Sequence, residues 1–131
     1  MLEFHQVHKT YTTPQGPLNV LNDVSLRLAA GESLALMGES GSGKSTLLHL
    51  AAGLDLPDQG TISFENQNVA SLPEPTRAKL RREQLGLVFQ QFHLVPSLTV
   101  IDNLRLQARL ANRDDADWTG HLIERLGLHG M

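Results

Sequence analysis

The sequence predicts an α/β fold with a small antiparallel β-sheet at its N-terminus. Apolar and polar residues alternate over residues 20–28, as in a strand with one buried face. Residues 33–37 and 85–89 are almost wholly apolar, which is typical of strands covered on both faces. Leucines recur at helical spacing between and after these two runs. We therefore expect strands and helices to alternate after about residue 31.

The individual elements follow from turn residues and periodicity. Leu2, Phe4 and Val7 indicate a first strand, and residues 11–17 are rich in Thr, Pro and Gly, which indicates a turn. The strand over residues 20–28 is then the hairpin partner of the first. Further along, we expect a helix over 44–54 and a strand over 61–64. A helix should start at the capping-box-like residues 71–74, and two more should cover 99–110 and 115–126.

Composition limits the classes of function. The chain has 131 residues, 40% of them apolar and 19% charged, which suits one globular domain. Its net charge of −3 gives no general attraction to nucleic acid or anionic lipid, and the absence of cysteine excludes disulfides and thiolate metal sites. We see no secretory signal and no apolar run of the ~20 residues that span a bilayer. We expect a soluble chain in a reducing cytoplasm.

A phosphate-binding loop is the strongest motif. Residues 38–45 match G-x-x-x-x-G-K-[ST] between a predicted buried strand and a predicted helix. Glycines let backbone N–H groups converge on phosphates, and the helix start adds the positive end of its dipole. Lys44 would contact the β- and γ-phosphates, and the hydroxyl of Ser45 would bind Mg²⁺. The nucleotide-binding residues are expected to be Gly38, Glu39, Ser40, Gly41, Ser42, Gly43, Lys44, Ser45 and Thr46.

The alternative interpretation of this segment is a glycine-rich turn with a solvated Lys44. We disfavour it because both the preceding strand and the following helix are predicted.

On these residues the chain resembles the N-terminal part of an ABC transporter nucleotide-binding domain, from about residue 2 to about residue 130. Residues 87–96, Leu-Val-Phe-Gln-Gln-Phe-His-Leu-Val-Pro, look like the family's Q-loop. The resemblance implies a P-loop NTPase fold with an incomplete RecA-like core. It divides the chain into an antiparallel β-subdomain over 1–31, a core portion over 32–91 and the start of a helical subdomain over 92–131.

The resemblance also assigns roles to two further residues. Tyr11 lies where the family has the aromatic residue that stacks on adenine, a contact that contributes about 1–3 kcal/mol. An ordinary turn aromatic is the alternative. Gln90 follows a predicted strand and can offer its carbonyl oxygen to Mg²⁺ or to the attacking water. The catalytic candidates are therefore Lys44 and Gln90, and the candidate metal ligands are Ser45 and Gln90. The alternative is a strand-end amide bonded to backbone, and Gln91 is disfavoured by register.

Residues 18–25, 51–55 and 78–81 look most like the subgroup that serves lipoprotein release and macrolide-type export. The resemblance implies an ATP-binding subunit that couples binding and hydrolysis of ATP, with Mg²⁺, to transport. Its partners would be integral membrane permease subunits and a second nucleotide-binding subunit, as a homodimer in the intact protein. It would then be peripheral on the cytoplasmic face of the inner membrane. No nucleic acid is expected as a partner.

Several parts of the family's catalytic apparatus do not occur in the sequence. They are the Leu-Ser-Gly-Gly-Gln signature, an apolar strand ending in Asp-Glu, and a switch histidine. We therefore expect a truncated chain that binds ATP weakly and hydrolyses it negligibly. Residues 85–89 would also lack neighbouring strands, which predicts self-association. Two alternatives stay open: a soluble ABC-type ATPase that acts on nucleic acid or ribosomes, and an inactive nucleotide-binding remnant.

Three other features have modest interpretations. His5 and His8 lie three apart on a predicted strand, which points them to opposite faces as surface residues. A basic run on one predicted helix is more easily a solvated face than a nucleic-acid patch; it comprises Arg77, Lys79, Arg81 and Arg82. Apolar residues around Pro96 suit either core packing or docking to a membrane subunit, and we favour docking; they are Phe92, Leu94, Val95 and Leu98.

Overall fold

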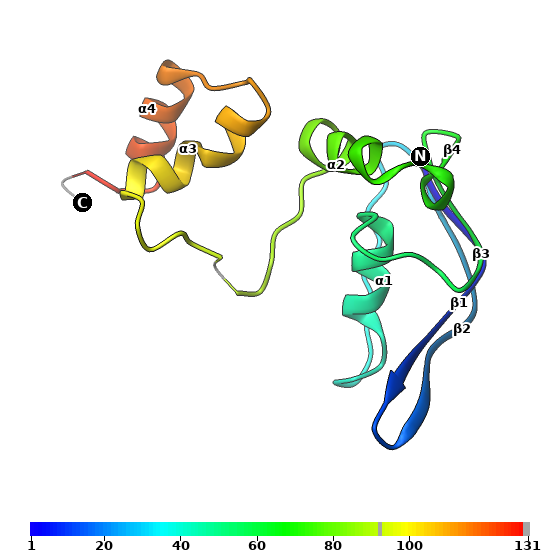
Figure 1. Ribbon diagram of the computed structural model, residues 1–131. Coiled ribbons are helices and arrows are strands. Elements are labelled where there is room, and N and C mark those ends of the chain that lie inside the picture. The colour runs from blue at the N-terminus through cyan, green and yellow to red at the C-terminus, as the bar shows by residue number, and fades with distance from the viewer. Residues whose placement is uncertain (92, 130–131) are drawn as a thin grey trace. The chain divides into compact units, whose positions relative to one another are not determined.

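The computed structural model describes residues 1–91 and 93–129, which form two compact units, Met1–Arg81 and Arg82–Met131. Each unit is described by itself. The first contains the strands β1 (Leu2–Thr13), β2 (Gly16–Leu28), β3 (Gln59–Phe64) and β4 (Gln67–Asn68) and the helix α1 (Lys44–Ala51). A 3₁₀ turn, η1 (Val69–Ser71), leads to α2 (Glu74–Glu83), whose last residues belong to the second unit (Figure 1).

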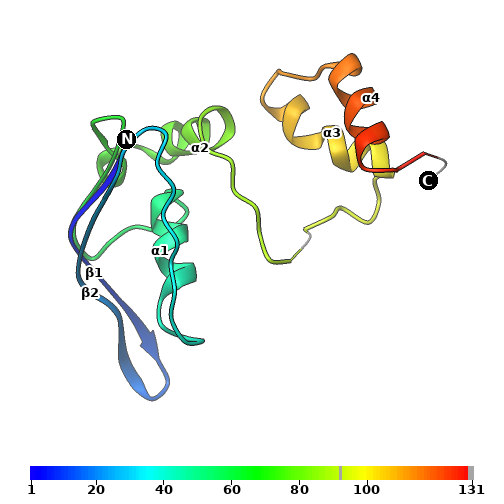
Figure 2. The same ribbon diagram turned by 180° about the vertical axis from the view of Figure 1, so that it is seen from behind.

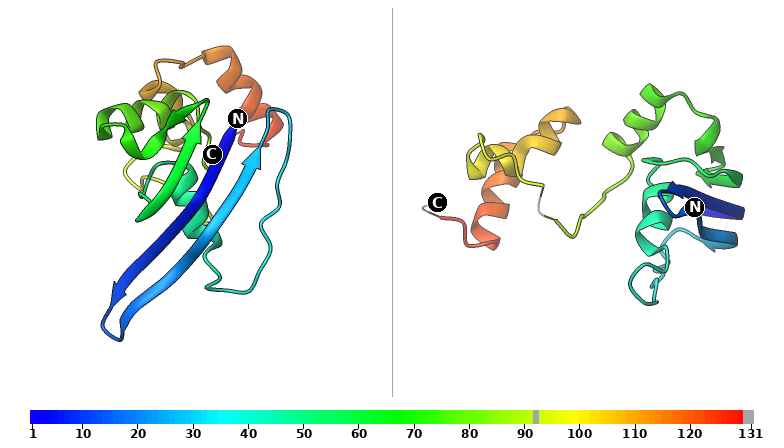
Figure 3. Two further views of the ribbon diagram at one scale, coloured as in Figure 1. Left: turned by 90° about the vertical axis from the view of Figure 1, so that its right-hand side faces the viewer. Right: turned by 60° about the horizontal axis from the view of Figure 1, so that its bottom comes forward.

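The strands form one antiparallel sheet in the order β2-β1-β3-β4 (Figure 3). The predicted N-terminal hairpin is confirmed, but its turn is shorter than predicted. Tyr11, Thr12 and Thr13 pair with Leu18, Pro17 and Gly16, so only two residues remain in the turn. Pairing across a two-residue loop outweighs the turn propensity of the Thr-Pro-Gly segment.

A β-bulge interrupts β1 at Gln6. The register shifts between Phe4 and Val7, and Gln6 has a left-handed backbone with φ of 48°. In a regular strand Phe4 and Val7 would face opposite sides, but both are buried here because a bulge contributes one extra residue. The prediction that His5 and His8 point to opposite faces assumed an uninterrupted strand. The bulge lies between these two residues, so the assumption is wrong.

The core of the first unit lies between the sheet and α1. Helix α1 covers one face of the sheet, as Figures 1 and 2 show. Its Leu47 and Leu50 are buried at helical spacing. The sheet and the segment after it contribute Phe4, Val7, Ile62 and Val69. This packing holds α1 against the sheet.

The two apolar runs do not form the strands predicted for them. Residues 33–37 and 85–89 are irregular, and within the described residues neither run pairs with a strand. Met37 is 91% exposed and Val88 is 96% exposed. A strand needs hydrogen-bonding neighbours, and apolar composition alone does not supply them.

The predicted helices form, with different ends. Helix α1 stops at Ala51 and not near Leu54, because Gly53 reverses the chain with φ of 63°. The predicted capping box at 71–74 is wrong, since Ser71 donates its hydroxyl to the carbonyl of Asn68 at 2.8 Å. Phe92, Gly130 and Met131 lie outside the described residues.

The second unit contains α3 (Val100–Leu110) and α4 (Ala116–Arg125). Thr99 caps α3 by accepting from the N–H of Asp102, and Asp115 caps α4 by accepting from that of Trp118. Arg105 donates to both oxygens of Asp114, at 2.8 and 2.5 Å, across the connection between the helices. That hydrogen-bonded pair lowers the pKa of the Asp114 carboxyl.

Candidate functional site

The loop before α1 has a backbone that glycine favours. Gly41 and Gly43 lie in the left-handed region, with φ of 81° and 89°. Gly43 is also the N-cap of α1, and a Cβ there would lie 2.9 Å from the carbonyl oxygen of Val20. The close approach of the loop to β2 therefore depends on this glycine.

Lys44 folds back across the loop. Its Nζ donates to the carbonyls of Gly38 and Glu39, at 2.8 and 2.5 Å, and to the hydroxyl of Ser42 at 3.2 Å. These are weak acceptors compared with a phosphate oxygen. The ammonium group is thus held at the mouth of the loop, where an anion can replace its neutral partners.

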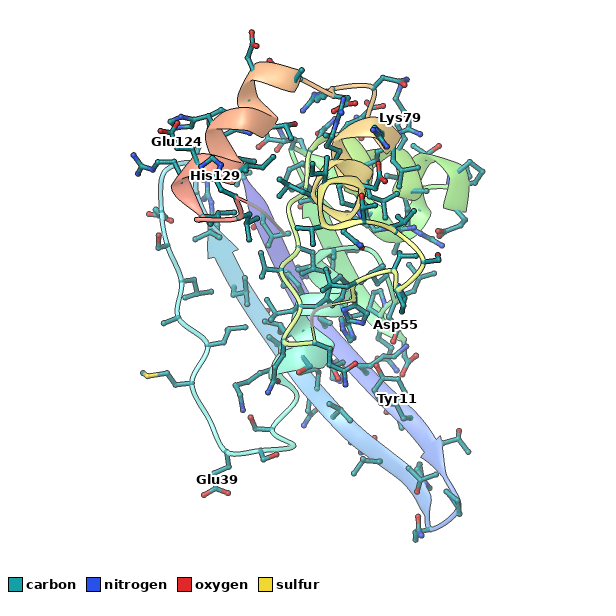
Figure 4. All side chains as sticks on the ribbon, turned by 90° about the vertical axis from the view of Figure 1, so that its left-hand side faces the viewer. Tyr11, Glu39, Asp55, Lys79, Glu124 and His129 are labelled. Atoms are coloured by element: carbon teal, nitrogen blue, oxygen red, sulfur yellow. The ribbon has the colours of Figure 1, made fainter. Side chains whose placement is uncertain are left out.

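The start of α1 has the chemistry of an anion site. No side chain caps the helix and its first turn contains no acidic residue, so its free N–H groups and its dipole both favour an anion. Glu39, the one acidic residue of the loop, points away from α1 (Figure 4). The exposed hydroxyl of Ser45 and the half-buried Thr46 lie in the first turn. A Mg²⁺-bound polyphosphate fits this donor set.

Tyr11 lies on β1 and is brought to the loop that follows α1. Its hydroxyl donates to Oδ2 of Asp55 at 2.8 Å, and the residue is 36% exposed. The side chain of Thr46, in the first turn of α1, acts on the same hydroxyl and lowers its pKa, which partly offsets the effect of burial and of Asp55. Tyr11 and the first turn of α1, which were separate predictions from sequence, are therefore joined in one unit.

A charged cluster lies under Tyr11, and sequence reasoning missed it. We call it the Lys9 cluster; it comprises Lys9, Tyr11, Asp55 and Asp58. Lys9 is 8% exposed and donates to Oδ1 of Asp55 at 2.9 Å and to the carbonyl of Leu56 at 2.7 Å, while its Nζ lies 5.1 Å from the centroid of the Tyr11 ring. A lysine two residues before an aromatic on one strand face was the only available signal.

The Lys9 cluster shifts the pKa of three of its members. Burial raises the pKa of the Tyr11 hydroxyl, and its bond to Asp55 raises it further. For Lys9 and Asp55, burial is the largest single influence on the pKa and opposes the shift, but their mutual hydrogen bond together with the other hydrogen bonds and charges of the cluster outweighs it. The pKa of Lys9 is therefore raised and that of Asp55 is lowered, so the ion pair is charged at neutral pH.

Gln90 lies in the second unit, in an exposed bend that follows the irregular run 85–89. Its predicted role as a ligand at the end of a strand has no strand to support it here. The carbonyl of Gln91 is 2.9 Å from Nδ1 of His93, and the ring of His93 packs edge-on against Phe89 at 4.6 Å. Both roles predicted for Gln90 stay predictions.

The loop before α3 is organised by Asn103, a second residue that sequence reasoning missed. Its amide donates to the carbonyls of Val95, Leu98 and Thr99, and its Oδ1 accepts from the N–H of Val95 at 2.8 Å. Leu94 is 67% exposed on the same loop. Docking and core packing of this loop both stay predictions, and Phe92 lies outside the described residues.

Three of the four cations of the basic run on α2 pair with carboxylates, although two of them share one. Arg77 and Arg81 both pair with Glu74 at 2.6 Å, and Arg82 pairs with Glu83 at 3.0 Å. Paired cations release few counterions on binding nucleic acid.

Within the described ranges, His, Asp and Glu form no group of three or more that could hold a metal. No described helix is long and apolar enough to cross a bilayer.

The chain is similar in sequence to known proteins. The family described as ABC transporter matches residues 21–131. A macrolide export ATP-binding/permease protein MacB from Chlorobium luteolum is 47% identical over 106 residues, which are 81% of this chain and 16% of that protein. An uncharacterized ABC transporter ATP-binding protein YbbA from Escherichia coli is 40% identical over 131 residues, 98% of this chain and 58% of that protein.

Solved structures agree with these sequence relatives. The dimeric structure of MJ0796, a bacterial ABC transporter cassette, matches with a TM-score of 0.83 and 35% identity, over 91% of this chain and 52% of that one. A post-hydrolysis state of the same cassette, bound to ADP and Pi, matches equally well. The chain thus spans about half of the cassette and of YbbA, and a smaller part of MacB.

The fold class expected from the sequence, the N-terminal part of an ABC-type P-loop domain, is confirmed by these matches, and MacB among the relatives supports the macrolide-export side of the predicted subgroup. The extent of the family match, with the phosphate loop at the start of α1, leads to one conclusion. The chain belongs to the ABC transporter family.

Proposed function

We propose that this chain is the ATP-binding part of a transport ATPase, in which residues 38–46 hold the phosphates and Mg²⁺ and Tyr11 holds the adenine. The observation that carries the proposal is the uncapped start of α1, with Lys44 folded over a glycine loop. Lys44 would exchange its bonds to two carbonyls for charged bonds to the β- and γ-phosphates. Ser45 would supply a hydroxyl to Mg²⁺, which in turn neutralises charge on the phosphates.

The proposed partners follow from the relatives. A solved cassette of this family is dimeric, and MacB joins an ATP-binding part to a permease part in one protein. In the intact protein, two copies of this domain would bind two ATP molecules, and permease parts in the membrane would respond to them. The domain would then lie on the cytoplasmic side of the membrane, with the exposed apolar residues around Leu94 available for docking.

Hydrolysis is proposed for the intact protein and not for these residues alone. Gln90 is the one candidate here for orienting the attacking water or for binding Mg²⁺ as it does so. We expect the 131-residue chain to bind ATP weakly and to release phosphate at a negligible rate. A phosphate release that Lys44→Ala abolishes would contradict this expectation.

Binding of Mg²⁺–ATP to the full chain, measured by isothermal titration calorimetry, tests the proposal. Lys44→Ala should weaken binding by about tenfold or more, because a charge-assisted bond to phosphate contributes roughly 1.5–3 kcal/mol. Lys79→Ala is the matched control, since Lys79 is an exposed lysine on α2 whose removal changes the net charge equally. It should leave the affinity within about twofold. Equal affinities for wild type and Lys44→Ala would reject the phosphate site.

The second candidate function, an ATPase that acts on nucleic acid, has less support. Three of the four basic residues on α2 are engaged with carboxylates of their own chain. We therefore retain transport as the proposed function.

A further inference from the structure

Tyr11 lies on the least supported part of the sheet. β1 pairs with β3 only as far as His8, and beyond that residue it pairs with β2 alone. A two-stranded ribbon is marginally stable by itself. An aromatic ring on such a ribbon has to be ordered before it can stack on a base, and this ordering reduces the binding free energy.

The turn after α1 holds this ribbon in place. Asp58 accepts from the N–H of Thr10 at 2.7 Å through its side chain, and its own N–H donates to the carbonyl of His8 at 3.0 Å. Lys9 reaches the carbonyl of Leu56 in the same turn. Because the turn continues from α1, these bonds connect the ribbon to the helix whose first turn belongs to the phosphate loop.

Within this connection, Asp55 controls the direction of the Tyr11 ring. Its Oδ2 accepts from the Tyr11 hydroxyl at 2.8 Å, and its Oδ1 accepts from Lys9 at 2.9 Å and from the N–H of Leu56 at 2.7 Å. With both oxygens engaged, the carboxylate is not free to rotate. Figure 4 shows Asp55 and Tyr11 next to each other. The ammonium of Lys9 lies over one face of the ring, which leaves the other face for a base.

We propose that Asp55, held by Lys9, is a positioning residue that fixes the Tyr11 ring as the platform for the base of an adenine nucleotide. The inference rests on the proposed function and adds a residue that acts through the Tyr11 hydroxyl and touches neither base nor phosphate. The site then has two parts. The phosphate loop binds any polyphosphate, and the Lys9 cluster increases the affinity for a nucleotide by positioning Tyr11 against its base.

The test compares two ligands with the full chain, Mg²⁺–ATP and Mg²⁺–tripolyphosphate, which has three phosphates and no base. Asp55→Ala should weaken binding of ATP about fivefold, roughly 1 kcal/mol, and change the affinity for tripolyphosphate by less than about twofold. Tyr11→Phe keeps the ring and removes the hydroxyl, so it should show the same selective loss. Asp55→Ala should add nothing in the Tyr11→Phe background, since the two residues act through one bond.

Glu124→Ala is the matched control for charge. Glu124 is an exposed carboxylate on α4, and its removal changes the net charge as Asp55→Ala does. It should leave both affinities within about twofold. Unchanged affinity for ATP in Asp55→Ala and Tyr11→Phe would overturn the proposal. So would an equal loss of ATP and tripolyphosphate, because it would show that Asp55 acts through the fold of α1.

Two further outcomes separate this inference from the proposed function. If the wild-type chain bound neither ligand, the phosphate site itself would be wrong. If the wild type bound both, with an affinity that Lys44→Ala lowers, and Asp55→Ala had no selective effect, only the positioning role would be rejected. Should Asp55→Ala fail to fold, the melting curve of Tyr11→Phe would still identify a folded variant for the comparison.

Discussion

The N-terminal sheet and the two apolar runs contain similar residues, yet only the sheet forms strands. β1 buries Phe4 and Val7 almost completely. Val88, in the run 85–89, is 96% exposed. The strands β1 and β2 find each other across a two-residue turn, whereas the runs 33–37 and 85–89 have no strand partner among the described residues. Hydrophobicity therefore determines which segments can be buried. Whether such a segment forms a buried strand depends on a neighbouring strand to which it can hydrogen-bond.

The largest expected effect on stability comes from replacing a phenylalanine with alanine, once in the sheet and once in the run 85–89. Phe4→Ala should lower the free energy of unfolding by about 3–5 kcal/mol, because Phe4 is 2% exposed in the core. Phe89→Ala should lower it by less than about 1 kcal/mol, since Phe89 is 43% exposed. Urea unfolding followed by circular dichroism measures both. Similar losses would mean that the run 85–89 is packed in solution.

A smaller effect is expected from the glycine that lets the phosphate loop approach β2. Gly43→Ala should destabilise the chain by about 1–3 kcal/mol, because of its positive φ and the 2.9 Å approach to Val20. Gly120→Ala is the matched control: Gly120 lies inside α4 with open space around it, and alanine there should stabilise by roughly 0.5–1 kcal/mol. Melting temperatures that shift in the same direction would contradict the described loop.

The exposed apolar run should make the chain self-associate, and one charge should reduce this. Val88→Glu adds repulsion and removes apolar surface, so we expect the dissociation constant of self-association to rise about fivefold, roughly 1 kcal/mol. Sedimentation velocity over a range of concentrations measures it. Leu50→Met, a change of similar volume in the core, serves as a control for general stability. A wild-type chain that stays monomeric throughout would rule out association through this run.

The smallest effect is a pH dependence at the Lys9 cluster. Folding lowers the pKa of Asp55, so its ionised form stabilises the fold at every pH above the unfolded value of about 4, and this contribution is lost as pH falls through the lower folded pKa. The difference in unfolding free energy between wild type and Asp55→Asn should thus be constant near neutral pH and shrink in acid below about pH 4. A gap that grows on acidification would reverse the assigned sign.

Sequence patterns with a local physical cause could be recognised in advance. The phosphate loop has fixed spacing, the hairpin has its partner nearby, and α3 and α4 have clear helical periodicity. Their bounds were predicted to within a few residues, with Gly53 ending α1 earlier than expected.

Features that depend on contacts distant in sequence could not be recognised. The pairing of Lys9 with Asp55 joins a strand to a turn 46 residues later, and no periodicity reports such a pair. The strands predicted at 33–37 and 85–89 failed for a related reason, because composition says nothing about which neighbours a segment will have.

The bulge at Gln6 determines which side chains of β1 face the core. Simple alternation from Phe4 would turn Val7 and Lys9 outward, but the extra residue of the bulge reverses this and both are buried. Deletion of Gln6, with every other residue kept, would turn Lys9 toward solvent and separate it from Asp55. Insertions and deletions of one residue in this strand should consequently be far more harmful than most substitutions, and length polymorphism here should be accepted only in compensating pairs.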